Sequence, residues 1–362
     1  MDNTKLFTTI NVISYDNPKL AHILLNTVLQ SEVNLNQVDN IIKKTIQVQP
    51  NIKHEIYLKR LEQLDYLYYL DLLKKNNISF ITYESNHYPD LLKEIAFPPL
   101  VLYYKGKIEY LRDPQIAVVG PRKNSSYGKE VCETFCKNLL PYFRILSGLA
   151  SGIDSIAHHT ALNKKQATIA VIGNGLNHIY PKNNQDLYKK IIENGVIISE
   201  YPPNTTPKPF YFPQRNRIVS GLSQGVLVCE ASEKSGSLVT ANLALEQNRE
   251  VFVVPGSIFS EYSTGTNKLI QQGALCTTSV KDILQELNIK NERFIITQSN
   301  ATNLTTKANN PILAFFSKTP ISIETLLSQT NLPLPNLLHH ITLLESAESI
   351  KKLPGNNYII ND

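Results

Sequence analysis

Apolar residues in the first 80 positions recur with the period of a helix. They form two faces, one made by Leu20, Ile23, Leu24 and Val28 and the other by Leu61, Leu64, Leu67 and Leu70. This pattern predicts a small helical domain over residues 1–80. The nearby tyrosines Tyr66, Tyr68 and Tyr69 would suit stacking on nucleic-acid bases, but core packing of the helices is the better interpretation.

From about residue 113 the pattern changes to short apolar runs separated by helical segments. The runs are Ile116–Val119, Phe143–Leu146, Thr168–Ile172, Val196–Ser199, Val226–Cys229 and Val251–Val254. Short apolar strands that alternate with helices predict an α/β core with a parallel sheet covered on both faces, and we assign residues 81–290 to it. Glycine or serine follows almost every run. We therefore expect a ligand crevice at the carboxyl ends of the strands.

The last part of the chain has a different pattern. Residues 291–310 are polar and lack a period, which is typical of a linker. Apolar periodicity resumes in 311–362, which predicts three helices and a short hairpin around Pro354-Gly355-Asn356, an order typical of a winged helix-turn-helix. Residues 301–362 carry equal numbers of lysines and acids. A protein contact or a scaffolding role is therefore a better interpretation of this domain than DNA reading.

Composition narrows the class of protein. Hydrophobic content of 42% and charged content of 19% are ordinary for a globular chain. Neither a signal peptide at MDNTKLFTTI nor a membrane-spanning apolar run is indicated, and four cysteines suggest no disulfide framework, so we expect a cytoplasmic protein. Cys132 and Cys136 have the spacing of a metal half-site, but two buried thiols are the better interpretation. All the excess positive charge falls within residues 110–290, where an anionic polymer should bind.

Three turns in the core combine small residues with cations. Gly120-Pro121-Arg122-Lys123 follows one strand, the loop from Ser147 to Gly152 follows the next, and Lys234-Ser235-Gly236-Ser237 opens a helix. Backbone N–H groups at helix starts, hydroxyls and nearby cations suit a polyanion. The candidate binding residues are Gly120, Arg122, Lys123, Ser147, Gly148, Ser151, Gly152, Lys234, Ser235, Gly236 and Ser237. The alternative is that these are surface cations and caps beside tight turns.

A fourth segment places aromatic residues before two arginines. Phe210, Tyr211 and Phe212 precede Arg215-Asn216-Arg217. Aromatic planes and cations are what single-stranded nucleic acid needs, so Phe212, Arg215, Asn216 and Arg217 join the candidate residues. The alternative is a buried aromatic loop whose arginines pair with Glu200 or Glu230, and residue types alone favour neither interpretation.

Motifs for catalysis are incomplete. Ser151, Asp154 and the two histidines His158 and His159 suggest a hydrolase, but the order G-L-A-S-G is no nucleophile elbow, and Asp154 fits a helix cap better. His178 stands where a dinucleotide fingerprint needs its third glycine, and no phosphate-binding P-loop motif is present. We therefore predict no catalytic residues, no metal site and no cofactor.

The core carries a linked series of motifs in a fixed order. They are SNHYPDLLKEIAFPPLVLYYKG at 85–106, IAVVGPRKNSSYG at 116–128, SGLASGIDSIAHHTAL at 147–162, TIAVIGNGLNHIYP at 168–181, SEYPP at 199–203, FPQRNRIVSGLS at 212–223, EASEKSGSLVTANLALEQNREVFVVPGS at 230–257 and GTNKLIQQGA at 265–274. The segment 79–290 resembles the DNA-processing protein A (DprA, also called Smf) family. The resemblance implies an extended Rossmann-like core, flanked by an N-terminal helical SAM-like domain and a C-terminal winged-helix domain.

The resemblance also implies a function. Family members are non-enzymatic proteins that bind single-stranded DNA, form dimers through the core, and help to load the recombinase RecA in natural transformation. The family's arginine after the first strand matches Arg122, its polar RNR loop matches 215–217, and its SGS loop matches 235–237, after Lys234. Two residues of the core, Pro121 and Asn204, depart from the family pattern. The segment 345–349 of the terminal domain also departs from it, because it lacks the glycine expected before the wing, and this leaves the role of that domain open.

The sequence therefore predicts a protein that holds and protects incoming single-stranded DNA at the ends of the strands. If Arg122, Arg215, Arg217 and Lys234 neutralise three or four phosphates, binding should fall with salt at a slope of roughly −2 to −3. Two alternatives remain open. One is a nucleotide-binding enzyme of the phosphoribohydrolase type, although Pro255-Gly256-Ser257 does not match the loop of those enzymes, and the other is a regulator that reads duplex DNA through residues 311–362.

Overall fold

The computed structural model describes residues 3–31, 37–289, 312–316, 319–330, 332–346, 350–353 and 357–360. Met1–Thr297 form one compact unit and Gln298–Asp362 form a second, and we describe each unit by itself. The predicted linker, 291–310, lies outside the described residues. Within the described parts of the chain, no helix is both long enough and apolar enough to cross a membrane.

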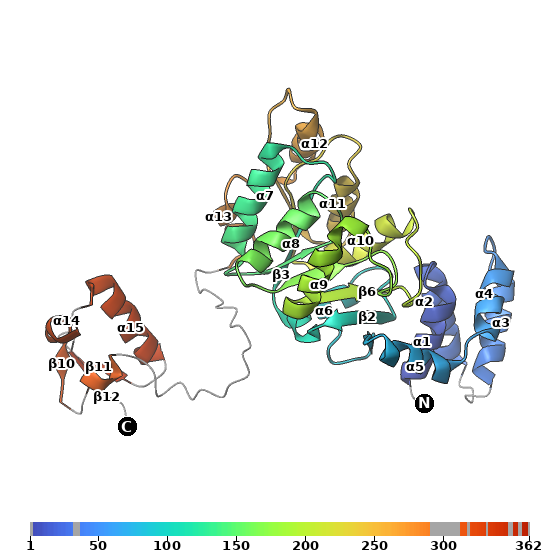
Figure 1. Ribbon diagram of the computed structural model, residues 1–362, viewed down its shortest axis with the longest axis horizontal. Coiled ribbons are helices and arrows are strands. Elements are labelled where there is room, and N and C mark those ends of the chain that lie inside the picture. Colours follow the sequence, from blue (N-terminus) through green and yellow to red (C-terminus); the bar gives the residue numbers. More distant parts are fainter. Residues whose placement is uncertain are drawn as a thin grey trace. The chain divides into compact units, whose positions relative to one another are not determined.

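A nine-stranded sheet forms the centre of the first unit (Figure 1). Its strands are β1 (Ser79–Thr82), β2 (Val101–Gly106), β3 (Gln115–Val119), β4 (Arg144–Ser147), β5 (Thr168–Val171), β6 (Val196–Ser199), β7 (Gly225–Val228), β8 (Glu250–Val253) and β9 (Leu275–Cys276), in the order β1-β2-β6-β5-β4-β3-β7-β8-β9. Strands β3 to β9 pair in parallel, whereas β2 pairs antiparallel with both β6 and β1. This arrangement confirms the predicted α/β, Rossmann-like fold.

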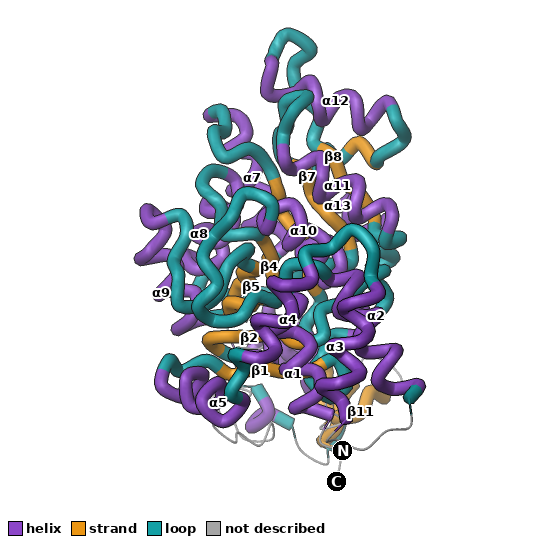
Figure 2. The backbone as a smooth tube through the Cα atoms, turned by 90° about the vertical axis from the view of Figure 1, so that its right-hand side faces the viewer, coloured by secondary structure: helices purple, strands orange, loops and turns teal. Residues whose placement is uncertain are grey.

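Helices cover both faces of this sheet, and Figure 2 shows strands at the centre with helices around them. The helices are α6 (Asp90–Lys93), α7 (Ser126–Leu139), α8 (Ile153–Asn163), α9 (Gln185–Asn194), α10 (Tyr211–Leu222), α11 (Gly236–Glu246), α12 (Thr264–Gln271) and α13 (Val280–Glu286), with 3-10 turns η2 (Ile108–Arg112), η3 (Lys182–Asn184) and η4 (Glu261–Ser263). Successive side chains of a strand point to opposite faces. Ile116 and Val118 of β3 accordingly pack with α7 and α8, while Ala117 and Val119 pack with α10 and α11.

The described residues among the first 75 are mainly helical, as predicted. The helices are α1 (Asn3–Ser14), α2 (Pro18–Gln30), α3 (Val38–Val48), α4 (His54–Glu62) and α5 (Tyr66–Lys75). The first predicted apolar face is confirmed, because Leu20, Leu24 and Val28 are buried. The second is only partly correct. Leu61 is buried, and Leu64 and Leu70 pack against the same cluster. Leu67 is 77% exposed, because Asp65 caps a new helix by accepting hydrogen bonds from the N–H groups of Leu67 and Tyr68, so that α4 and α5 are separate.

The N-terminal helices share a hydrophobic cluster with β2 and β6 of the sheet. Within it, the hydroxyl of Tyr69 donates to that of Tyr103, and Tyr103 donates to Oδ1 of Asn11, both over 2.8 Å. Tyr69 is therefore a core residue, as the preferred interpretation expects, whereas Tyr68 is 65% exposed. The assignment of residues 1–80 to a separate SAM-like domain stays a prediction.

An aromatic cluster joins the N-terminal helices to the start of α10. The ring of Tyr15, which follows α1, lies 6.1 Å from that of Tyr201 and 6.3 Å from that of Tyr211, between ring centroids. The guanidinium of Arg60 covers Tyr15 at 4.4 Å and forms an ion pair with Asp16 at 2.8 Å. These contacts fix the position of Tyr211, the first residue of α10.

The second unit has its own small core. It contains the 3-10 turn η5 (Leu313–Phe315), β10 (Ile321–Ser322), α14 (Ile323–Thr330), α15 (Leu334–Ser346), β11 (Ile350–Leu353) and β12 (Asn357–Ile360). The strands form a sheet in the order β10-β12-β11, so the predicted antiparallel hairpin is observed. Three helices were predicted, but among the described residues only α14 and α15 are α-helices, and the segment 312–316 contains a 3-10 turn. The predicted hairpin turn, 354–356, and the departure at 347–349 lie outside the described residues.

Candidate nucleic-acid interface

Three loops converge at the carboxyl ends of β3, β4 and β7. Together with the starts of α10 and α11 they enclose an open groove of about 400 Å³, which we call the crest groove. The predicted residues that line it are Gly120, Arg122, Gly148, Phe212, Arg215, Asn216, Ser235, Gly236 and Ser237. A smaller cavity of about 50 Å³ shares Arg122, Gly148 and Phe212 and is also lined by Ser151 and Tyr180. The predicted convergence of the loops is therefore observed.

Arg122 places an exposed guanidinium beside an aromatic ring. Its Cζ lies 5.6 Å from the ring centroid of Phe212, within the range of a cation–π contact. Phe212 in turn lies 5.2 Å from the ring of Tyr180, which is 42% exposed. No hydrogen-bond or ion-pair partner of Arg122 is found in the described part of the chain. Its donors therefore remain available to an anion in the groove.

The beginning of α11 also lines the crest groove. Ser235 is the N-cap and accepts a hydrogen bond from the N–H of Ser237, and the two hydroxyl oxygens lie 2.7 Å apart. An added Cβ at Gly236 would meet nothing within 4 Å, so this turn is open to the groove. The N-terminus of a helix carries a partial positive charge and unpaired N–H groups. This wall can accept a phosphate.

A buried carboxylate fixes the loop from Ser147 to Gly152. Asp154 accepts hydrogen bonds from the backbone N–H groups of Gly148 at 3.1 Å and Ala150 at 3.2 Å. Desolvation raises the pKa of Asp154, and the positive charge of Arg215 acts in the opposite direction. Asp154 is thus a structural hydrogen-bond acceptor. The sequence favoured this interpretation over a catalytic one.

His158 likewise belongs to the interior. Its Nδ1 lies 2.7 Å from the hydroxyl of Thr168, and burial lowers the pKa of His158 to about 3. Thr168 already donates to the carbonyl of Ile145, so His158 is the donor in this pair. Among the described residues, neither Asp154 nor His158 is hydrogen-bonded to Ser151, and the three do not form the relay that a serine hydrolase uses.

Arg215 and Arg217 do not present their charges at the groove surface, and this corrects the expectation that they supply charge to it. Arg215 is buried, and its Nη1 donates to the carbonyl oxygens of Gly148, at 2.6 Å, and Val171. Burial lowers the pKa of Arg215, and the negative charge of Asp154 partly offsets this effect. Arg215 therefore supports the loop of Gly148 from below through these hydrogen bonds, and its side chain also forms part of the groove wall.

Arg217 instead forms a buried ion pair with Glu200, and it does not line the crest groove. The two side chains are 12% and 4% exposed. The alternative of paired arginines is thus half correct: Arg217 pairs with Glu200, while Glu230 accepts from the N–H of Ser125 at 2.9 Å and from its hydroxyl. Because Glu200 neutralises the guanidinium of Arg217, this charge is not available to a phosphate of the ligand.

The sequence model of the family described as DNA recombination-mediator protein A matches residues 79–288. This chain belongs to that family. The chain is 45% identical to the DNA processing protein DprA of Bacillus subtilis over 223 residues, which is 61% of this chain and 75% of that protein.

Two solved structures of family members are also similar. The X-ray structure of DNA processing protein A from Streptococcus pneumoniae has a TM-score of 0.66 and 37% identity, covering 75% of this chain and 95% of that one. A structure of DNA processing protein A from Helicobacter pylori, which concerns that protein's single-stranded DNA binding mode, has a TM-score of 0.53 and 33% identity. It covers 58% of this chain and 96% of that one.

Several predicted residues of this DprA family member lie outside the groove and cavity. They are Lys123, Ser147, Gly152, Arg217 and Lys234. The hydroxyl of Ser147 is buried and donates to the carbonyl of Val118 at 2.7 Å. Gly152, with φ of 79°, packs against the backbone of Pro121 and Arg122, where a side chain would not fit. Lys123 and Lys234 are exposed on the loops beside the groove.

Tyr180 was not predicted as a site residue, although the motif TIAVIGNGLNHIYP contains it. An aromatic residue at the end of a strand-to-helix loop was the available signal. The cysteines contribute nothing to the groove: Cys132 and Cys136 are buried, with sulfurs 3.9 Å apart. In the parts of the chain that are described, no three His, Cys, Asp or Glu residues are grouped to hold a metal ion.

Proposed function

We propose that this protein binds single-stranded DNA in the crest groove. The observation that carries the proposal is the exposed guanidinium of Arg122, which lies over Phe212 and lines the same groove as the open N-terminus of α11. A cation next to an aromatic plane suits the alternation of phosphate and base in a single strand. A duplex hides its bases in the stack and would leave the aromatic residues unused.

The groove residues divide into two roles. Arg122 and the turn from Ser235 to Ser237 hold phosphates, while Phe212 and Tyr180 offer ring faces to a base. Behind them, Asp154 and Arg215 hold the loop of Gly148 in place. Arg215 and Arg217 add no phosphate contacts, so Arg122 with Lys123 and Lys234 at the rim would neutralise two or three phosphates. The salt slope should then be roughly −1.4 to −2.1 rather than −2 to −3.

We further propose the wider role that the family suggests: protection of incoming single-stranded DNA, loading of RecA and dimer formation, in the cytoplasm and without catalysis. Membership of the DNA recombination-mediator protein A family supports this role. So does the relative from Helicobacter pylori, whose structure concerns single-stranded DNA.

A competition experiment tests the binding proposal. Wild type and Arg122→Ala are titrated against single-stranded and duplex DNA over a series of salt concentrations, with Lys44→Ala on α3 as the matched control. We expect a preference for single strands, a loss of about tenfold in affinity for Arg122→Ala that is independent of base sequence, and no change in the control. Equal binding of both DNA forms, unaffected by Arg122→Ala, would contradict the proposal.

The two alternatives have their own tests. Release of free base from nucleoside monophosphates would favour the phosphoribohydrolase alternative. Loss of duplex binding on replacing Lys351 and Lys352, the exposed lysines of β11, by glutamine would favour the duplex regulator. We expect neither result.

A further inference from the structure

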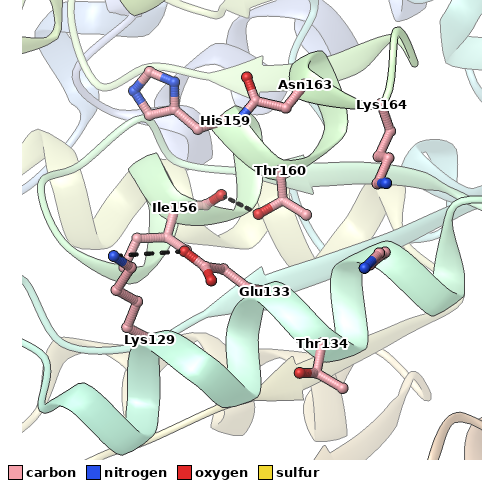
Figure 3. A pocket seen from close by; sticks show the side chains of 9 residues that line it. Lys129, Glu133, Thr134, Ile156, His159, Thr160, Asn163 and Lys164 are labelled. Carbon is pink, nitrogen blue, oxygen red and sulfur yellow. Dashed lines mark hydrogen bonds and ion pairs between the residues drawn. The ribbon is translucent and has the colours of Figure 1, made fainter.

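A second groove, of about 540 Å³, runs between α7 and α8 on the side of the core (Figure 3). We call it the α7–α8 groove. The side chains that carry the argument are Lys129, Glu133 and Lys137 of α7 and His159, Asn163 and Lys164 of α8 and its C-cap. Nothing in the site described above makes use of these residues.

The charge of this groove is mainly positive. Lys129 and Glu133 form a pair with 3.8 Å between Nζ and Oε1, but their side chains are 59% and 50% exposed, so the pair is weak and exchangeable. In the described part of the chain, Lys137 and Lys164 have no ion-pair partner. Desolvation, with Lys190 nearby, lowers the pKa of His159, which therefore stays neutral near pH 7. Three lysines thus face one carboxylate.

The two helices that form the α7–α8 groove begin at the loops of the crest groove, although the two grooves share no lining residue. The loop that carries Arg122 leads into α7, and the loop of Gly148 leads into α8. The two loops contact each other, because the N–H of Ile153 donates to the carbonyl of Pro121 over 3.3 Å. At 1.5 Å per residue, α7 extends about 16 Å from Ser126 to Lys137. That length spans about five stacked nucleotides at 3.4 Å each.

We propose that the α7–α8 groove carries the backbone of the single DNA strand after it leaves the crest groove. This inference rests on the proposed function. A strand longer than the crest groove must pass over some part of the surface, and the cations that begin at Arg122 and Lys123 continue along this path to Lys129 and Lys137. The phosphates displace the carboxylate of Glu133 from Lys129 as they bind, while Asn163 and His159 can donate to phosphate oxygens. Contacts to phosphates alone make this part of the site indifferent to base sequence.

The test compares two lengths of oligothymidylate, of six and of twenty nucleotides, by fluorescence anisotropy on the full chain. The variant Lys137→Gln/Lys164→Gln is compared with a matched control, Lys44→Gln/Lys53→Gln, which removes two exposed lysines from the N-terminal helices. For the long oligonucleotide we expect the first variant to weaken binding about 5- to 10-fold and to reduce the salt slope by about 1.4, the value for two phosphates. The short oligonucleotide and the control should be unaffected.

A second variant tests the sign of the effect. Glu133→Gln removes the competing carboxylate and should tighten binding of the long oligonucleotide about 2- to 3-fold, without changing the short one. The inference is overturned if Lys137→Gln/Lys164→Gln binds the long oligonucleotide as the control does, or if it weakens both lengths equally. Failure of the proposed function looks different, because the short oligonucleotide would then bind with no dependence on Arg122.

Discussion

Replacement of Arg217 by methionine should destabilise the protein without weakening its hold on a short DNA strand. Arg217 and Glu200 form a buried ion pair in which both side chains are nearly inaccessible to water. Burial already raises the pKa of Glu200, and the charge of Arg217 opposes that rise. Without Arg217 the carboxylate would stay buried and unpaired. Breaking a buried pair in this way costs about 3–5 kcal/mol.

A double-variant comparison isolates the pair. Arg217→Met and Glu200→Leu should each be strongly destabilising, whereas the two together should recover most of the loss, because a buried pair can often be exchanged for apolar residues at little cost. The chain has no Trp, so urea unfolding is best followed by circular dichroism, with the free energy of unfolding obtained by linear extrapolation. Binding of the six-nucleotide strand is then measured under conditions where Arg217→Met remains folded.

The expected affinity of Arg217→Met for the short strand is within about twofold of wild type, since its side chain does not line the crest groove. The opposite result is equally clear. An Arg217→Met variant that unfolds within about 0.5 kcal/mol of wild type, but binds the short strand weakly and with a reduced salt slope, would show that Arg217 contacts a phosphate and that its pairing with Glu200 is dispensable.

Two further predictions concern buried titratable groups. Burial lowers the pKa of His158 to about 3, whereas an unfolded histidine titrates near 6.5, so the unfolded state binds more protons between these values and stability should fall by about 2 kcal/mol from pH 7 to pH 5. His158→Gln should remove most of that fall, measured from urea midpoints at the two pH values. An unchanged dependence of stability on pH in this variant would refute the prediction. Asp154→Asn should loosen the loop of Gly148, lower the free energy of unfolding by about 1–3 kcal/mol and weaken binding of the short strand several-fold. The control Asp186→Asn, at an exposed position, should change neither stability nor binding. Equal affinities of Asp154→Asn and wild type, measured by fluorescence anisotropy, would contradict the role of Asp154 in positioning the loop.

The central strands could be predicted because their environment leaves a plain pattern. Strands β3 to β8 are covered on both faces, so most of their residues are apolar, and each predicted run lies within one residue of the observed strand. Strands β1 and β2 were missed because β1 is the edge strand and β2 lies next to it, and burial falls off toward one end of each strand. The two-residue β9 is too short to give a period.

The site was harder to predict because the type of a residue does not reveal whether its side chain points into the core or toward solvent. Arginines beside aromatics suggested a surface for DNA, yet Arg215 lies in step with Ile218, Val219 and Leu222, the buried face of α10. The helical spacing of these residues is visible in the sequence, but the charge of an arginine favours an exposed position more strongly than the spacing favours a buried one. The pairing of Arg217 with Glu200 depends on a contact between distant elements, and only the two alternatives could be stated beforehand.

The cluster of Tyr15, Tyr201 and Tyr211 has a consequence for how this chain can be divided. The sequence model of the family matches from residue 79, but the preceding helices bury Leu100, Tyr103 and other residues of the core in a common cluster. Each large apolar side chain stripped of its cover would lose about 1.5–3 kcal/mol. A truncated fragment that starts at residue 79 would expose this surface to solvent and to other copies of itself. We therefore expect such a fragment to aggregate. The segment that the family model matches is therefore smaller than the segment that we expect to fold by itself.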